Sequence, residues 1–66
     1  MELSATNKFI MTLMHEDSVL FPIFSLFANG IVEFSEVLKI AENAGIDFKN
    51  YVESRGFDYN IIKEGL

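Results

Sequence analysis

VLFPIFSLFANGIV, residues 19–32, is the segment around which the rest of this chain must fold. Seven of its first nine residues are large and apolar. Side chains of this kind are stabilised by removal from water, so the neighbouring segments have to cover them. The segment therefore predicts the position of the core, and it does not indicate an activity.

Helix signals lie at both ends of this segment. Acidic and polar residues at 16–18 supply acceptors and negative charge where a helix would start. Pro22 leaves two starts open, because the helix either begins near Ser18 and bends or begins at Pro22 after a short turn. Gly30 predicts the stop, with Ile31 folding back on the last helical turn.

The same start and stop signals recur along the chain. Met1 to Leu3 are expected to fray, and N-caps followed by apolar residues at helical spacing predict further helices. These are a first helix over 5–15 behind Ser4, a third from the N-cap Ser35 to Gly45, a fourth from Asp47 to Gly56, and a last turn from Asp58 to Gly65. Because no segment alternates with period two, the sequence predicts one all-α domain over 1–66, a compact bundle of four to five short helices.

Composition favours association with another chain. The protein has 66 residues and no cysteine, and a lone core of this size contributes only about 3–5 kcal/mol. Half of the residues are hydrophobic and seven are Phe, which is more apolar material than a small monomer can bury. We therefore expect a homodimer, with Phe21, Phe24 and Phe27 in the core or at the dimer interface.

The net charge of −5, from ten acidic and five basic residues, repels phosphate backbones and argues against direct binding of nucleic acid. No window reaches the ~18 continuous apolar residues that a membrane span needs. The N-terminus also lacks the basic flank and cleavage site of a signal peptide. A cytoplasmic protein that does not bind membranes is expected.

Residues 21–38 resemble an EF-hand. Gly30 and Glu36 match the sixth and twelfth positions of its loop. The first and third positions, which supply calcium ligands in that family, are Ser25 and Phe27 here, and phenylalanine offers no oxygen. A helix, a glycine stop and a second helix explain the same matches, so we expect no calcium site.

Residues 40–56, IAENAGIDFKNYVESRG, resemble the helix-turn-helix of DNA-binding regulators. Ala41, Ala44, Gly45 and Ile46 fall at the small-residue, turn and aliphatic positions of that motif. Two helices that cross closely need small contacts and a left-handed turn. A helix-turn-helix-like pair is therefore predicted within the bundle.

The resemblance implies that the second helix of this pair would read DNA. Its charge is unsuited to that role, because Lys49 and Arg55 are cancelled by Asp47 and Glu53 on an acidic protein. A transcriptional regulator that binds DNA through residues 35–56 is therefore kept as the alternative function.

Most of the chain also resembles the leader domains of the Nif-type precursor peptides, which recruit modifying enzymes to a natural-product core. The resemblance rests on the first helix, the Asp17 turn, the apolar second helix and the segment AENAGIDF at 41–48. The double-glycine cleavage site and the Cys- or Ser-rich core peptide of that family are not found in this sequence.

Chemically active residues are sparse. His15 is the only histidine, and its place near the end of the first helix is typical of a C-terminal cap. Glu33 and Glu36 flank a helix start, where acids stabilise the helix dipole. No phosphate-binding loop or nucleophile elbow is present, so we expect no enzyme, no metal site and no cofactor.

These observations favour a small acidic protein–protein interaction module that docks on a larger protein or protein–nucleic-acid complex and inhibits or regulates it. Viruses and mobile elements use compact acidic chains to inhibit host machinery by covering a basic site, and this step rests on analogy. The predicted contact residues are exposed carboxylates or, alternatively, exposed aromatic residues: Glu33, Glu36, Glu42, Asp47 and Glu53, or Tyr51, Phe57 and Tyr59.

Overall fold

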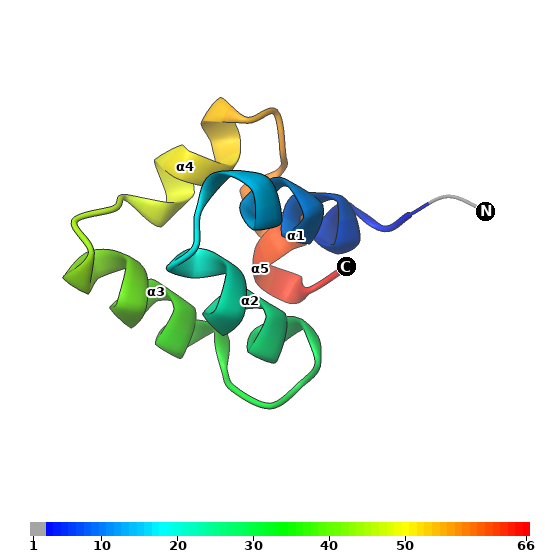
Figure 1. Cartoon of the computed structure of the whole chain (residues 1–66). Helices are drawn as coiled ribbons and strands as arrows, with labels where there is room; N and C mark the ends of the chain where they lie inside the picture. Colours follow the sequence, from blue (N-terminus) through cyan, green and yellow to red (C-terminus); the bar gives the residue numbers. More distant parts are fainter. Residues whose placement is uncertain (1–2) are drawn as a thin grey trace.

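The structure, a computed structural model, describes residues 3–66. These residues form five α-helices joined by short turns (Figure 1): α1 Ala5–Glu16, α2 Leu20–Ala28, α3 Phe34–Asn43, α4 Phe48–Ser54 and α5 Tyr59–Glu64. No strand occurs within 3–66, so the predicted all-α fold is confirmed. The expected fraying of Met1 and Glu2 lies outside the described residues.

α2 begins at Leu20, between the two predicted starts. The Asp17 carboxylate accepts hydrogen bonds of 2.9 Å from the backbone N–H groups of Val19 and Leu20, as an N-cap does. Pro22 is the third residue of the helix. The first four N–H groups of a helix have no intrahelical partner, so the missing donor of Pro22 costs no helical hydrogen bond there.

Glycine stops end the helices where the sequence predicts them. After α2, Gly30 adopts a φ of 75° and donates to the Phe27 carbonyl at 3.0 Å, while Ile31 donates to the Leu26 carbonyl at 2.9 Å. This pair of bonds is the Schellman motif, whose left-handed residue favours glycine. The same pair of bonds closes α3, α4 and α5.

The predicted start of the third helix is wrong. Glu33, not Ser35, is the N-cap of α3, and its side chain makes no capping hydrogen bond. Phe34 is already helical, and its ring packs against the rings of Phe27 and Phe48 with centroids 5.2 and 5.7 Å apart. Packing of this aromatic ring, which the local sequence does not reveal, outweighs the capping preference of a serine hydroxyl.

The other predicted N-caps are confirmed. The Ser4 hydroxyl accepts from the Asn7 N–H at 3.1 Å, and the Asp47 carboxylate accepts from the Asn50 N–H at 3.2 Å. Asp58 does the same at the start of α5. These short polar side chains satisfy N–H groups that the first helical turn leaves without acceptors.

Nine buried hydrophobic side chains, drawn from all five helices, form the core: Phe9, Leu13, Leu20, Phe24, Val37, Ala41, Phe48, Val52 and Ile62. The ring of Phe9 is central to it and meets the rings of Phe24, Phe48 and Phe57 edge-on, with centroids 5.1, 5.9 and 5.2 Å apart. Each such pair contributes about 0.5–1.5 kcal/mol beyond the buried area. One side chain of α1 thus links α2, α4 and the segment before α5.

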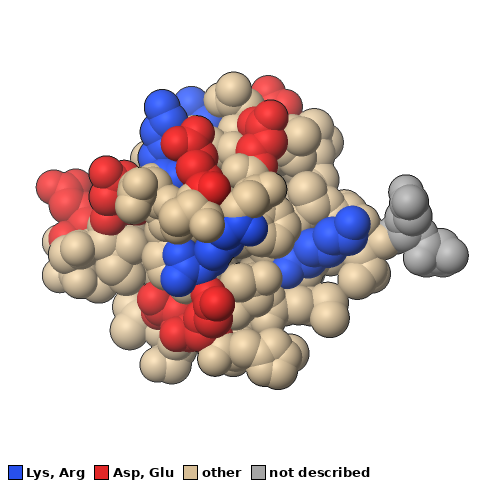
Figure 2. All heavy atoms as spheres, turned by 90° about the horizontal axis from the view of Figure 1, so that it is seen from above, with Lys and Arg blue, Asp and Glu red and all other residues tan. Residues whose placement is uncertain are grey.

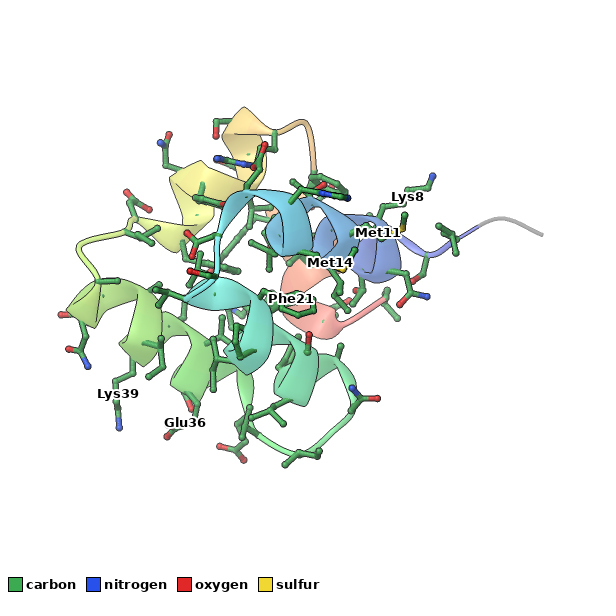
Figure 3. The ribbon with its side chains drawn as sticks, viewed as in Figure 1. Lys8, Met11, Met14, Phe21, Glu36 and Lys39 are labelled. Carbon is green, nitrogen blue, oxygen red and sulfur yellow. The ribbon has the colours of Figure 1, made fainter. Side chains whose placement is uncertain are left out.

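The three phenylalanines of α2 have different environments. Phe24 is fully buried, so its predicted place in the core is confirmed. Phe27 is half-buried and packs on Phe34 of α3. Phe21 is half-buried on the side of α2 that faces α1, as Figure 3 shows.

The two ends of the described chain are joined at the start of α1. Both the backbone N–H and the hydroxyl of Thr6 donate to the Leu66 carbonyl, at 2.9 and 2.8 Å. Thr6 is buried, and its N–H belongs to the first turn of α1, which offers it no acceptor. This contact holds α5 beside α1, and both ends lie on one side of the molecule (Figure 1).

Candidate functional site

Within residues 3–66 no pocket is found, and no three His, Asp or Glu side chains lie close enough together to hold a metal ion. Ser25 and Phe27, at the first and third positions of the EF-hand-like segment, lie in helix α2 and not in a loop. The described part of the chain instead presents two distinct surfaces, one acidic and one apolar.

The acidic surface consists of the five predicted carboxylates on α3, α4 and the link between them. Residues 33–54 carry five acidic side chains against Lys39 and Lys49, which gives −3 of the total charge of −5. All five carboxylates are exposed: Glu33, Glu36, Glu42, Asp47 and Glu53. They are spread from the start of α3 to the last turn of α4, and no three of them converge.

Two of these carboxylates already have partners. Glu36 lies 3.8 Å from the Lys39 ammonium, and both side chains project from α3 into solvent (Figure 3). Such an exposed pair contributes little to stability. The Asp47 carboxylate caps α4. Among residues 3–66, Glu33, Glu42 and Glu53 form no ion pair or side-chain hydrogen bond, so they are the carboxylates best placed to meet a partner.

The three aromatic residues predicted to be exposed are half-buried. The rings of Tyr51 and Phe57 approach Phe9, with centroids 6.2 and 5.2 Å away, and Tyr59 lies 6.0 Å from Phe34. α4 and α5 are short, so their few large side chains are needed to close the core. The predicted exposure of these rings is therefore wrong, although their exposed edges remain available for contact.

Arg55 is held by partners that the sequence does not reveal. Its Nε donates to the Glu16 carboxylate of α1, its Nη1 donates to the Tyr51 carbonyl at 3.0 Å, and its guanidinium lies 3.5 Å from the centroid of the Tyr51 ring. The expected cancellation by Asp47 and Glu53 is therefore replaced by an ion pair that ties α4 to α1. Figure 2, which views the molecule from above, shows acidic and basic side chains side by side on that face.

The Tyr51 hydroxyl is a buried polar group without a hydrogen-bond partner among the described residues. Burial raises the pKa of Tyr51 above its ordinary value, the nearby Arg55 guanidinium opposes the shift, and the Asp17 and Glu16 carboxylates add to it. Burial, together with the Asp47 carboxylate, also raises the pKa of Tyr59. Both phenols are therefore stabilised in their neutral form by the fold.

The apolar surface lies on the outer side of α1 and α2. No charged residue occurs from 18 to 32, although only Leu20 and Phe24 of α2 are fully buried. Figure 3 shows Met11 and Met14 of α1 on the same side of the molecule as Phe21 of α2. We define this apolar surface by the residues that it exposes fully or in part: Met11, Met14, Val19, Phe21, Pro22 and Leu26.

The sequence predicts that neighbouring segments cover the apolar stretch 19–32. The structure covers only one side of it, because Val19 keeps 50% and Leu26 39% of its surface in contact with solvent. The signal that could have located this surface is the absence of charge at every outward position of the helix. An amphipathic surface helix carries polar residues there.

No protein-family model matches this sequence, and no curated protein or solved structure is significantly similar to it. No helix within 3–66 is long and apolar enough to cross a membrane.

Proposed function

We propose that this protein is a small interaction module that docks on a larger protein or protein–nucleic-acid complex, and that it inhibits or regulates that partner by covering a basic site. The observation that supports this proposal is the exposed net charge of −3 over residues 33–54, on α3 and α4. Arg55, at the end of α4, does not offset this charge, since its guanidinium is paired with Glu16.

A net negative charge on part of a surface acts mainly before the partner makes contact. It steers a partner of opposite sign, raises the association rate and disfavours wrong partners. Because the five carboxylates are spread over two helices, they fit an extended basic surface better than a single cation. A partner site rich in Lys or Arg has this chemistry.

The test begins with capture of partners on immobilised protein, followed by association rates measured at low salt. Reversing two unpaired carboxylates, Glu42→Lys with Glu53→Lys, is expected to slow association by at least about tenfold, because rim charges act mainly on the association rate. Both residues are exposed, so far-UV circular dichroism should stay unchanged.

A matched control is available on α5. Glu64→Lys and Glu42→Lys alone each change the net charge by two units, but Glu64 lies outside the acidic surface. Only Glu42→Lys should slow association clearly. Equal effects of the two variants would show that total charge, not the acidic surface, matters, and unchanged rates for the double variant would contradict the proposal.

The DNA-binding alternative has less support. Arg55 is engaged by Glu16 and Tyr51, and Lys49 lies 6.0 Å from the ring centroid of Tyr59, so α4 offers few free cations to phosphates. The same binding experiment with duplex DNA discriminates the two functions. Binding of DNA that weakens steeply with salt would favour the regulator.

A further inference from the structure

α2 is unusual for a surface helix in having no polar side. Nine residues, LFPIFSLFA, contain one serine and no charge, and the outward positions are occupied by Pro22 and Leu26. A helix that is apolar all round is normally buried on all sides. Here one side packs on the core and the other lies in solvent, so something outside the described chain is expected to cover it.

The size of the apolar surface fits a protein interface. Four of its side chains, Met11, Met14, Val19 and Leu26, each leave between 39% and 55% of their surface in solvent. Exposed apolar patches of about 300–600 Å² are often functional on monomeric proteins. A standard interface removes about 800 Å² from each partner, roughly a fifth of the 4334 Å² that the described residues expose. Such interfaces in homodimers are about 65% apolar, so the apolar surface would form the centre of the interface and polar residues around it the rim.

The charge distribution indicates which molecule covers the apolar surface. Two copies of this protein each carry −5 and repel one another wherever their acidic surfaces meet. The apolar surface is the region where they can approach without that cost, because residues 18–32 are uncharged. Figure 3 shows Lys8 beside the methionines and Glu36 and Lys39 on the α3 side.

The two methionines make the surface adaptable. Met11 and Met14 expose 49% and 55% of their surface, and their flexible thioether side chains can fill an irregular facing surface. In a two-fold symmetric dimer each copy presents the same patch to the other, so a patch that can adjust its shape is readily self-complementary.

We infer that two copies of this protein form a symmetric dimer through the apolar surface, with Met11, Met14 and Leu26 at its centre. The dimer is formed by residues of α1 and α2, whereas Glu42, Asp47 and Glu53 lie at the end of α3, on α4 and between them, so its formation does not depend on the proposed docking function. Of the three phenylalanines expected in the core or at the dimer interface, Phe24 is buried inside each copy and Phe21 is part of the apolar surface.

The test compares Met14→Glu with Ile61→Glu by sedimentation velocity over a wide concentration range. Both residues are exposed and apolar, and both substitutions add one negative charge, but Ile61 lies on α5 outside the apolar surface. Met14→Glu places two carboxylates in the symmetric interface and is expected to raise the dimer Kd by roughly 100-fold, since like charges across an interface cost several kcal/mol. Ile61→Glu should leave the Kd within about threefold of the wild-type value.

Thermal melting monitored by circular dichroism establishes whether each variant is folded. If Met14→Glu unfolds, Met11→Lys replaces it, because Met11 is also half exposed. A wild-type protein that stays monomeric at high micromolar concentration would overturn the inference, and so would equal Kd values for the Met14 and Ile61 variants. Neither result would affect the docking proposal, which is tested by association rates of the acidic variants.

Discussion

At the scale of single residues, short polar side chains start several helices, and one ion pair ties two distant helices together. Ser4, Asp47 and Asp58 act within three residues of their own position, so their capping roles can be read from sequence. The ion pair of Arg55 with Glu16 joins residues 39 positions apart, and only the fold brings them together. In this chain, contacts between residues close in sequence can be predicted, and contacts between distant residues cannot.

Tyr51 provides the prediction at this scale. Its buried hydroxyl lacks a partner, so Tyr51→Phe should leave the free energy of unfolding unchanged or raise it by up to about 1 kcal/mol. The ring keeps its contacts with Phe9 and the Arg55 guanidinium. Urea denaturation measures the change, and Tyr59→Phe, whose hydroxyl is not buried without a partner, is the control. A loss of more than about 1 kcal/mol for Tyr51→Phe would show that the hydroxyl has a partner.

Ionisation of Tyr51 and Tyr59 should make the free energy of unfolding depend on pH. The folded state raises the pKa of Tyr51 and Tyr59, so it favours their neutral forms. Stability from these groups is therefore fully present below the ordinary tyrosine pKa of about 10 and is lost as the pH rises through the higher folded-state values. Tyr51→Phe should make this alkaline loss shallower. An unchanged alkaline profile would show that ionisation of the buried Tyr51 phenol does not cause the loss.

At the scale of helices, the stops are predictable and some starts are not. Each glycine stop needs only the local backbone, and all of them lie where the sequence places them. The start of α3 depends on where Phe34 packs. The start of α2 depends on hydrogen bonds from the Val19 and Leu20 N–H groups to the Asp17 carboxylate, two and three residues earlier in the chain. The half-buried rings of Tyr51 and Phe57 were missed for the same reason, because they fill a core that forms only when the short helices assemble.

Asp17 provides the prediction for α2. Asp17→Ala removes two capping hydrogen bonds and should cost about 1 kcal/mol of unfolding free energy. For a domain of this size that loss lowers the melting temperature by about 4–8 °C. Ser18→Ala is the neighbouring control, since no hydrogen bond of its side chain is found within 3–66. If both variants melt at the same temperature, Asp17 does not cap α2.

For the molecule as a whole, the sequence indicates that a short acidic chain has too much apolar surface, and the structure shows where that surface lies. Its outward part gathers on α1 and α2, while five carboxylates are carried by α3, α4 and their link. Of the stretch 19–32, only the side of α2 that carries Leu20 and Phe24 lies in the core, as predicted. Which side stays exposed depends on helix packing, which periodicity alone does not determine.

The two surfaces lead to one central claim, namely that a basic partner and a second copy of this chain bind to different residues of the molecule. The most direct measurement is the mass of the complex with a captured partner, determined by light scattering after size-exclusion chromatography. We predict two copies of this chain in the wild-type complex, and one copy, still bound to its partner, for Met14→Glu. A wild-type complex that holds a single copy would contradict the claim, because the partner would then have displaced the second copy from the apolar surface.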